Sequence, residues 1–258
     1  MSRFEWLEVP GKKKDSIEDE TVRKEFDVEY YLKLADENYH EGQYEKSLRY
    51  YSKALNHDHK LEKPWIGQLF CLIDLGEYNE SITWADKALE VFPGSHAILA
   101  SKALAWGRLG YLEKAKAFSD VSLKAGGESS FVWWVRGDIL MAENERNAEF
   151  CFNKAMELET NNWELLIRIG KTFLSVDKPL RAREYFLHAR TIRNDIPLIW
   201  YWLGISYRQA KIYKEAEECF KRAVELNPHH PEFKKILSDI KRVNPFLKLI
   251  FRLKNFLK

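Results

Sequence analysis

The sequence repeats itself with a period of about 34 residues, and this recurrence limits what the chain can fold into more than any other feature. Small side chains recur at separations of 34, 34, 33, 34 and 34 residues, at Ser47, Ser81, Ala115, Ala148, Ala182 and Ala216. A second small residue follows each of them seven positions later, at Ala54, Ala88, Ser122, Ala155, Ala189 and Ala223. Seven residues make two helical turns, so each pair lies on one helix face. A period of this length is typical of chains built from stacked copies of one short unit.

A large side chain precedes each small one by about sixteen residues. These large residues are Tyr31, Trp65, Leu99, Trp133, Leu166 and Trp200. Small positions let a neighbouring helix approach closely, and the bulky residue of that neighbour fills the space between them. Turn residues divide each unit into two halves, in EGQY (41–44), LGEY (75–78), LGYL (109–112) and DKPL (177–180). The pattern therefore predicts six helical hairpins that begin near Val28, Glu62, His96, Ser130, Trp163 and Pro197.

One stretch carries the unit in its most complete form. Residues 200–228 read WYWLGISYRQAKIYKEAEECFKRAVELNP, which resembles the tetratricopeptide repeat family and its pattern W-x2-L-G-x2-Y, then A-x3-F, then a terminal Pro. The matching residues are Trp200, Leu203, Gly204, Tyr207, Ala216, Phe220, Ala223 and Pro228. The resemblance covers six units and about four-fifths of the chain.

This resemblance implies an all-α fold, a right-handed superhelical solenoid of about six helix-turn-helix units over residues 28–230. Three units depart from the family pattern. The second has Ala85 and the third has Ser119 where the family has Phe, and the fourth lacks one residue in its turn, between Ala142 and Asn147. Because each hairpin in such a stack is held by its neighbours, we expect these departures to leave the fold unchanged.

The segments outside the repeats differ in character. Residues 231–243, PEFKKILSDIKRV, have apolar side chains at i, i+3, i+4 and i+7, which predicts a helix that covers the last hairpin. We expect residues 1–27 to be flexible, with a short helix over 17–26 that follows a capping-box pattern at Ser16 and Asp19.

The final stretch, 244–258, is both apolar and basic and predicts an amphipathic tail helix. Such a helix would span only about 21 Å at 1.5 Å per residue, too short to cross a bilayer. The residues expected to contact a membrane or a partner are Phe246, Leu249, Ile250, Arg252, Leu253, Phe256 and Leu257. Three placements are open for this tail: against the capping helix or a second copy of the protein, on an anionic membrane surface, or in a groove of this protein or of a partner.

In the tetratricopeptide repeat family the first helix of each unit lines a concave groove, and the resemblance implies which residues would contact a bound peptide there. They are Ile66, Phe70, Ile73, Leu104, Arg108, Phe131, Trp134, Asp138, Ile167, Lys171, Leu174, Tyr201, Ile205 and Arg208. Many are apolar, which favours an amphipathic helix or an extended apolar peptide as the ligand. An error of one residue in the register would instead place such residues in the core between units.

Some family members hold the terminal carboxylate of heat-shock chaperones through Lys, Asn and Arg side chains. The corresponding positions here are Leu32, Asp36, Gly67, Ala97 and Ser101. The resemblance therefore disfavours a partner anchored by its terminal carboxylate, because these side chains provide no cationic donor.

Composition and spacing argue against several other functions. The 41 basic and 39 acidic residues give a net charge of +2, which disfavours nucleic acid as a partner. The start of the chain has acidic residues where a secretory signal would be apolar, and Cys71, Cys151 and Cys219 lie far apart without a CxxC motif. We find no spacing typical of catalytic groups, phosphate loops, metal ligands or cofactor binding, and so expect neither an enzyme nor a cofactor.

Two functional hypotheses remain. The first is a cytoplasmic, non-enzymatic interaction scaffold or chaperone-like adapter that binds an apolar peptide or helix of a client protein in its groove. The alternative is a peripheral membrane assembly factor that docks through its basic amphipathic tail. A homo-oligomer is compatible with either hypothesis.

Overall fold

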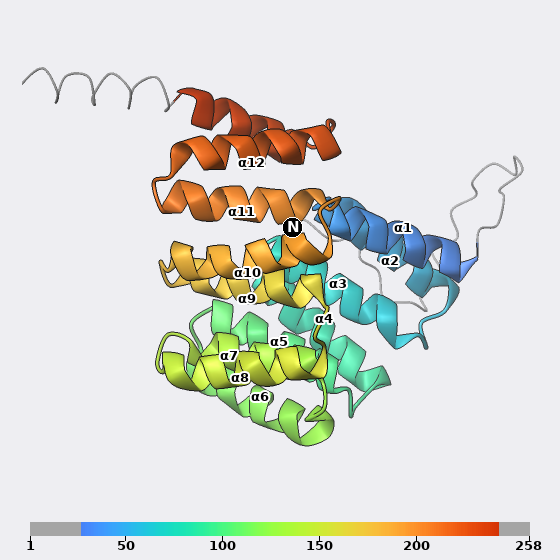
Figure 1. Ribbon diagram of the computed structural model, residues 1–258. Helices are drawn as coiled ribbons and strands as arrows, with labels where there is room; N and C mark the ends of the chain where they lie inside the picture. Colours follow the sequence, from blue (N-terminus) through green and yellow to red (C-terminus); the bar gives the residue numbers. More distant parts are fainter. Residues whose placement is uncertain (1–26, 243–258) are drawn as a thin grey trace, which may run out of the picture. The chain divides into compact units, whose positions relative to one another are not determined.

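The computed structural model describes residues 27–242, which form helices joined by short turns (Figure 1). The chain divides into two compact units at Ala125 and Gly126. The first unit has the helices α1 (Val28–His40), α2 (Tyr44–His57), α3 (Glu62–Asp74), α4 (Tyr78–Val91), α5 (His96–Arg108) and α6 (Leu112–Gly126). The second has α7 (Ser130–Leu140), α8 (Glu145–Leu158), α9 (Trp163–Ser175), α10 (Pro179–Ile192), α11 (Pro197–Gln209) and α12 (Tyr213–Leu226), and then a helix over 231–242.

The predicted helical hairpins are confirmed. The first helices of the six hairpins begin at the six predicted residues, Val28, Glu62, His96, Ser130, Trp163 and Pro197. Five of these helices, α1, α3, α7, α9 and α11, pack against the helix that follows them. In the third hairpin, where α5 precedes α6, the Ser122 hydroxyl donates a hydrogen bond of 2.8 Å to the carbonyl oxygen of His96.

The recurring small residues form the close contacts between helices. All twelve of them, from Ser47 to Ala223, have exposed fractions of 0%. In the last three hairpins a phenylalanine ring of the second helix fills the space above a glycine of the first. A Cβ placed on Gly204 would lie 2.5 Å from Cε1 of Phe220, and Gly170 and Phe186 form the same kind of pair. Only a residue without a side chain fits beneath these rings.

The departures at Ala85 and Ser119 have a packing explanation. The second hairpin has Ala85 at the position where the last three hairpins have phenylalanine. In the first helix of the same hairpin, Leu69 stands at the position of their glycine. Leu69 and Ala85 are both fully buried in one cluster, so the large and small partners have exchanged helices. In the third hairpin both positions are small, with Ala103 opposite Ser119 in the repeat register. The fold is kept in both hairpins because the spacing of the two helices depends on the pair of residues between them and not on either residue alone.

In most of the hairpins, one residue of the inner turn has a left-handed backbone conformation. Gly42, Gly76 and Gly110 occupy the same position in the first three hairpins with φ of 78°, 80° and 84°, a left-handed conformation that glycine adopts without strain. Asp177 and Lys211 take that conformation in the fifth and sixth hairpins. The fourth hairpin lacks the residue, as predicted: α7 has 11 residues where the other first helices have 13.

Three tryptophans fix the turns between hairpins. The indole nitrogen of Trp65 donates to the carbonyl oxygen of His59, six residues earlier, at 3.0 Å. Trp133 and Trp200 make the same bond to the residues six positions before them, at 2.6 and 2.8 Å. The large residue of the repeat therefore also fixes the chain as it enters each of these hairpins.

The helix over 231–242 covers the last hairpin, as the sequence predicted. Phe233, Ile236 and Ile240 have exposed fractions of 1%, 7% and 2%, and the ring of Phe233 lies 5.1 Å from that of Tyr201 in α11. The helix expected over 17–26 and the tail helix expected over 244–258 lie outside the described residues.

Candidate partner-binding surface

The first helices of successive hairpins are neighbours within each unit. In the first unit α3 contacts both α1 and α5, and in the second unit α9 contacts both α7 and α11. Their side chains therefore form a continuous row in each unit, which we call the first-helix surface. It consists of residues of α1, α3 and α5 in the first unit and, separately, of α7, α9 and α11 in the second.

In the first unit most of the predicted contact residues remain accessible. Ile66, Phe70 and Ile73 on α3 are half-buried, as is Arg108 at the end of α5. Leu104 is buried, with an exposed fraction of 2%. This part of the surface therefore offers a short apolar stripe on one helix beside a guanidinium group on the next.

In the second unit the predicted residues divide into two groups. Accessible residues from all three first helices are Phe131, Asp138, Lys171, Leu174 and Ile205, which are half-buried, and Arg208, which is exposed. Trp134, Ile167 and Tyr201 are buried, with exposed fractions of 5%, 6% and 8%. These three support the surface from below, and the first group provides the atoms that a partner can touch.

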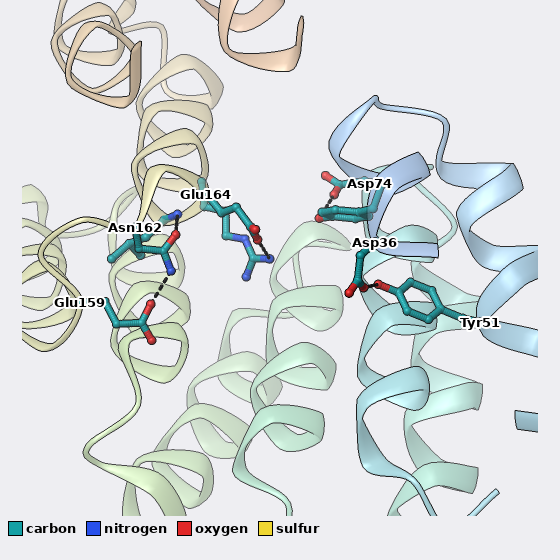
Figure 2. A network of polar contacts seen from close by, with 9 residues as sticks. Asp36, Tyr51, Asp74, Glu159, Asn162 and Glu164 are labelled. Carbon is teal, nitrogen blue, oxygen red and sulfur yellow. Dashed lines mark hydrogen bonds and ion pairs between the residues drawn. The ribbon is translucent and has the colours of Figure 1, made fainter. Parts of the chain in front are cut away.

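Carboxylates on α1 and α3 are held by hydrogen bonds within the chain (Figure 2). The Tyr51 hydroxyl donates to Asp36 at 2.6 Å. The Lys63 ammonium group donates to the other carboxylate oxygen of Asp36 at 2.7 Å. The Tyr39 hydroxyl donates to Asp74 at 2.6 Å. The hydrogen bonds from Tyr51 and Lys63 occupy both carboxylate oxygens of Asp36 within the chain.

The second unit holds two cations of α9 against aromatic rings of its neighbours. The guanidinium carbon of Arg168 lies 5.3 Å from the ring centre of Phe131 and 5.5 Å from that of Trp134, both on α7. On the other side the Lys171 nitrogen lies 4.9 Å from the ring centre of Trp202 on α11. Cations placed over aromatic faces at these distances are attracted to the ring electrons. Both contacts link adjacent first helices.

Further polar groups fix the position of α9. The Thr172 hydroxyl donates a hydrogen bond to Asp138 on α7. Glu164, one turn before Arg168, lies 3.8 Å from its guanidinium group (Figure 2). The Asn162 side chain accepts from the backbone N–H of Leu165 at 3.0 Å and caps the start of the helix. α9 is therefore held at its first turn and along the side that faces α7.

Tyr201 links α11 to the last helix. Its hydroxyl donates a 2.6 Å hydrogen bond to Glu232. Burial raises the pKa of the Tyr201 phenol well above its usual value, and the hydrogen bond to the Glu232 carboxylate raises that pKa further. The hydroxyl therefore stays protonated and remains a donor throughout the physiological pH range.

Sequence reasoning missed two features. It did not identify Arg168 or Trp202, although each directly follows a predicted residue in the sequence. It also missed apolar side chains on the second helices, where the most exposed are Val121, Phe150, Leu158 and Leu180 at 44–56%. The amphipathic pattern of the helices could have pointed to these residues, because each interrupts a polar helix face.

Other candidate chemistry is limited. No group of three or more His, Cys, Asp and Glu among residues 27–242 is arranged to hold a metal ion. Burial raises the pKa of the Cys219 thiol to about 12 and that of Cys71 further, which makes both thiols poor nucleophiles. Of the helices in the described part of the chain, none has the length and apolarity needed to cross a membrane. The tail residues predicted to touch a membrane or partner lie outside that part.

Comparison with known proteins places the repeat in a family context. A family model for the tetratricopeptide repeat matches residues 197–230. The human protein named Protein O-mannosyl-transferase TMTC3 is 32% identical over 84 residues. That match covers 32% of this chain and 9% of the human protein, so the chain spans less than a tenth of this curated relative.

Solved structures share the fold at low sequence identity. A tetratricopeptide repeat protein from Parabacteroides merdae has a TM-score of 0.55 and 17% identity, with 83% of this chain and 84% of that chain covered. The Cut9 and Hcn1 hetero-tetramer of the APC/C has a TM-score of 0.51 and 15% identity, with 83% of this chain and 43% of that chain covered.

Proposed function

Because this chain belongs to the tetratricopeptide repeat family, whose members mediate protein–protein interactions, we propose that it is a non-enzymatic interaction scaffold or chaperone-like adapter. Its ligand is an apolar peptide or helix of a client protein. The binding site is the first-helix surface of the second unit, where Phe131, Leu174 and Ile205 are half-buried on α7, α9 and α11.

One observation carries this proposal: the two cations of α9 are held over aromatic rings of both neighbouring helices. Arg168 lies over Phe131 and Trp134, and Lys171 lies over Trp202. Aromatic residues and Arg are enriched at the centres of protein interfaces, where they contribute most of the binding energy. Rings and cations that are already positioned lose little conformational entropy when a partner binds.

The mixture of side chains also indicates the kind of ligand. A peptide that packs apolar side chains on Phe131 and Ile205 buries hydrocarbon there, and its backbone carbonyl groups and carboxylates can pair with Lys171 and Arg208. Spaced apolar anchors with polar groups between them are typical of an amphipathic helix bound in a groove. Each fully buried apolar anchor contributes about 1.5–3 kcal/mol.

A selection experiment tests this proposal with a peptide library in place of the client. Peptides are selected from a random library displayed on phage with the full chain as bait, and their affinities are measured by fluorescence anisotropy. We expect the selected peptides to be rich in apolar residues. The double variant Phe131→Ser and Ile205→Ser is expected to weaken binding at least about tenfold, because two anchors are lost.

The matched control removes apolar side chains from second helices of the same unit. Phe150→Ser and Leu180→Ser change residues with exposed fractions of 56% and 51%, and we expect this double variant to bind the peptides as the wild type does. Circular dichroism establishes that both variants keep their helices. If the control pair abolished binding and the Phe131 and Ile205 pair did not, the ligand would sit on the second helices and the proposal would be wrong.

A further inference from the structure

One helix face that is covered in the second hairpin is exposed in the first. In α3 the side chains of Gln68 and Cys71 face the preceding helix α2: the Gln68 amide donates to the Ser52 hydroxyl at 2.8 Å, and the Cys71 thiol lies 3.3 Å from the Ser47 hydroxyl. Gln68 and Cys71 have exposed fractions of 2% and 0%. Within the units α5 and α11 likewise pack against the second helix of the preceding hairpin.

The same face of α1 carries charged groups that are open to water. In the repeat register Leu34 and Glu37 stand at the positions of Gln68 and Cys71, and Lys33 and Tyr30 complete the face. The side chains of Lys33 and Glu37 are 75% and 54% exposed, and Tyr30 is 39% exposed.

Acidic residues predominate around this face. The exposed charged residues of α1 and its two flanking positions are Asp27, Glu29, Lys33, Glu37 and Glu41, four acids and one base. We call these five residues, together with Tyr30 and Leu34, the acidic edge.

The last described helix has an open face of the opposite charge. In α11 the position of Gly204 lies against the rest of its own hairpin, where Gly204 meets the ring of Phe220 in α12, and Trp200 lies one turn before it. In the helix over 231–242 the same register positions are Lys234 and Ser238, and both are exposed. This face therefore has no second helix packed on it among the described residues.

Basic residues predominate on that helix. Its exposed charged residues are Glu232, Lys234, Lys235, Asp239, Lys241 and Arg242, of which four are basic. The acidic Glu232 already accepts the Tyr201 hydrogen bond. Residues 243–258 add four more basic residues and no acidic one to the sequence. We call the four exposed basic residues of the helix, together with Ser238, the basic edge.

We propose that copies of this chain associate head to tail, with the basic edge of one copy docked on the acidic edge of the next. The acidic edge corresponds to the face of α3 on which the preceding hairpin stacks, and the basic edge corresponds to the face of α11 on which α12 packs, so a second copy supplies a helical surface of the kind that covers each face elsewhere. Opposite charges steer the two edges together and disfavour contacts between like edges. Tyr30 and Leu34 supply apolar area at the acidic edge, and the half-buried Leu237 lies beside the basic edge.

The contact is heterologous, because two different faces meet, and this has a measurable consequence. Such contacts do not close on themselves in a pair, so the assembly grows with protein concentration or ends in a ring. Salt screens these charges because they are exposed. Raising the ionic strength from about 0.1 M to about 1 M shortens the Debye length from about 10 Å to about 3 Å. We therefore expect high salt to disperse the assembly. This association is independent of the peptide-binding function proposed above.

Sedimentation velocity of the full chain over a concentration series tests the proposal. We expect the average mass to rise with concentration at low salt and to return to the monomer value at high salt. The variant Glu29→Lys with Glu37→Lys makes both edges basic. The variant Lys234→Glu with Lys241→Glu leaves the helix over 231–242 with four exposed acids and two exposed bases, so that it carries the same sign of charge as the acidic edge. Each variant alone is expected to associate at least about tenfold more weakly than the wild type, because attraction has become repulsion.

An equal mixture of the two variants gives the decisive result. Each variant offers the edge that the other lacks, so the mixture is expected to associate although neither does so alone. The control variant Glu113→Lys with Glu157→Lys reverses two acids away from both edges, with side chains 91% and 63% exposed, and should associate like the wild type. A wild type that stays monomeric at low salt up to about 1 mM, a range that includes weak complexes, would overturn the proposal. So would association that persists in each single-edge variant or is absent from their mixture.

Discussion

The substitution Gly204→Ala sets two opposing effects against each other in the helix α11. Alanine in a helix interior is favoured over glycine by about 0.8–1 kcal/mol. Here, however, the added Cβ would lie 2.5, 2.7 and 3.0 Å from three ring atoms of Phe220. The ring cannot easily move aside, because Phe220 has an exposed fraction of 0%. Overpacking of this kind costs about 1–3 kcal/mol, occasionally more.

We therefore expect Gly204→Ala to lower the free energy of unfolding by up to about 2 kcal/mol, because the clash outweighs the gain in helix propensity. Urea unfolding followed by circular dichroism measures the change. The control is the same substitution in a Phe220→Leu background, where the ring is gone and the cost of the added methyl group should fall or change sign. If Gly204→Ala stabilised the wild type by the amount expected from helix propensity, the packing argument for the glycine would be refuted.

Two further predictions follow from the buried ionisable groups. The folded pKa of Tyr201 is raised above its unfolded value of about 10, so its stabilising contribution is complete below that pH and is lost as the pH rises above it. Phenylalanine at position 201 cannot ionise, so the stability advantage of the wild type over Tyr201→Phe should shrink above pH ~10, as urea titrations would measure. An advantage that grew above that pH would contradict a raised pKa for Tyr201 in the folded protein. The Cys71 and Cys219 thiols, whose pKa values burial raises, should be alkylated by iodoacetamide at neutral pH far more slowly in the native than in the denatured protein. Mass spectrometry measures this, and equal rates would show that these thiols are accessible.

The helical hairpins could be predicted from the sequence because small and large side chains recur at fixed positions of each unit. Each small position must be small wherever two helices touch, so the period survives even where the family pattern does not. The exchange between Leu69 and Ala85 shows this, since the pair fills the same space with its members reversed. The missing residue of the fourth hairpin was visible for the same reason, because it shifts the next small residue by one position.

The details of the first-helix surface were harder to predict, because they depend on how a side chain crosses between helices. Arg168 on α9 contacts Phe131 on α7, which is 37 positions away in the sequence. A local sequence pattern does not indicate a contact between such distant positions. Burial was also difficult to judge, because successive helical residues are turned by about 100°. Trp134 and Tyr201 are buried for this reason, whereas Phe131 and Ile205, each a few residues away, remain accessible.

The claim that the first helices bind the partner is tested most directly by site-specific crosslinking within one hairpin. A photoreactive phenylalanine analogue replaces either Phe131 on α7 or Phe150 on α8, and each protein is irradiated with a peptide selected by the wild-type chain. Both positions hold a phenylalanine in the wild type, so the two replacements are closely matched. Crosslinking at 131 and none at 150 is the predicted result, whereas crosslinking at 150 alone would contradict the account.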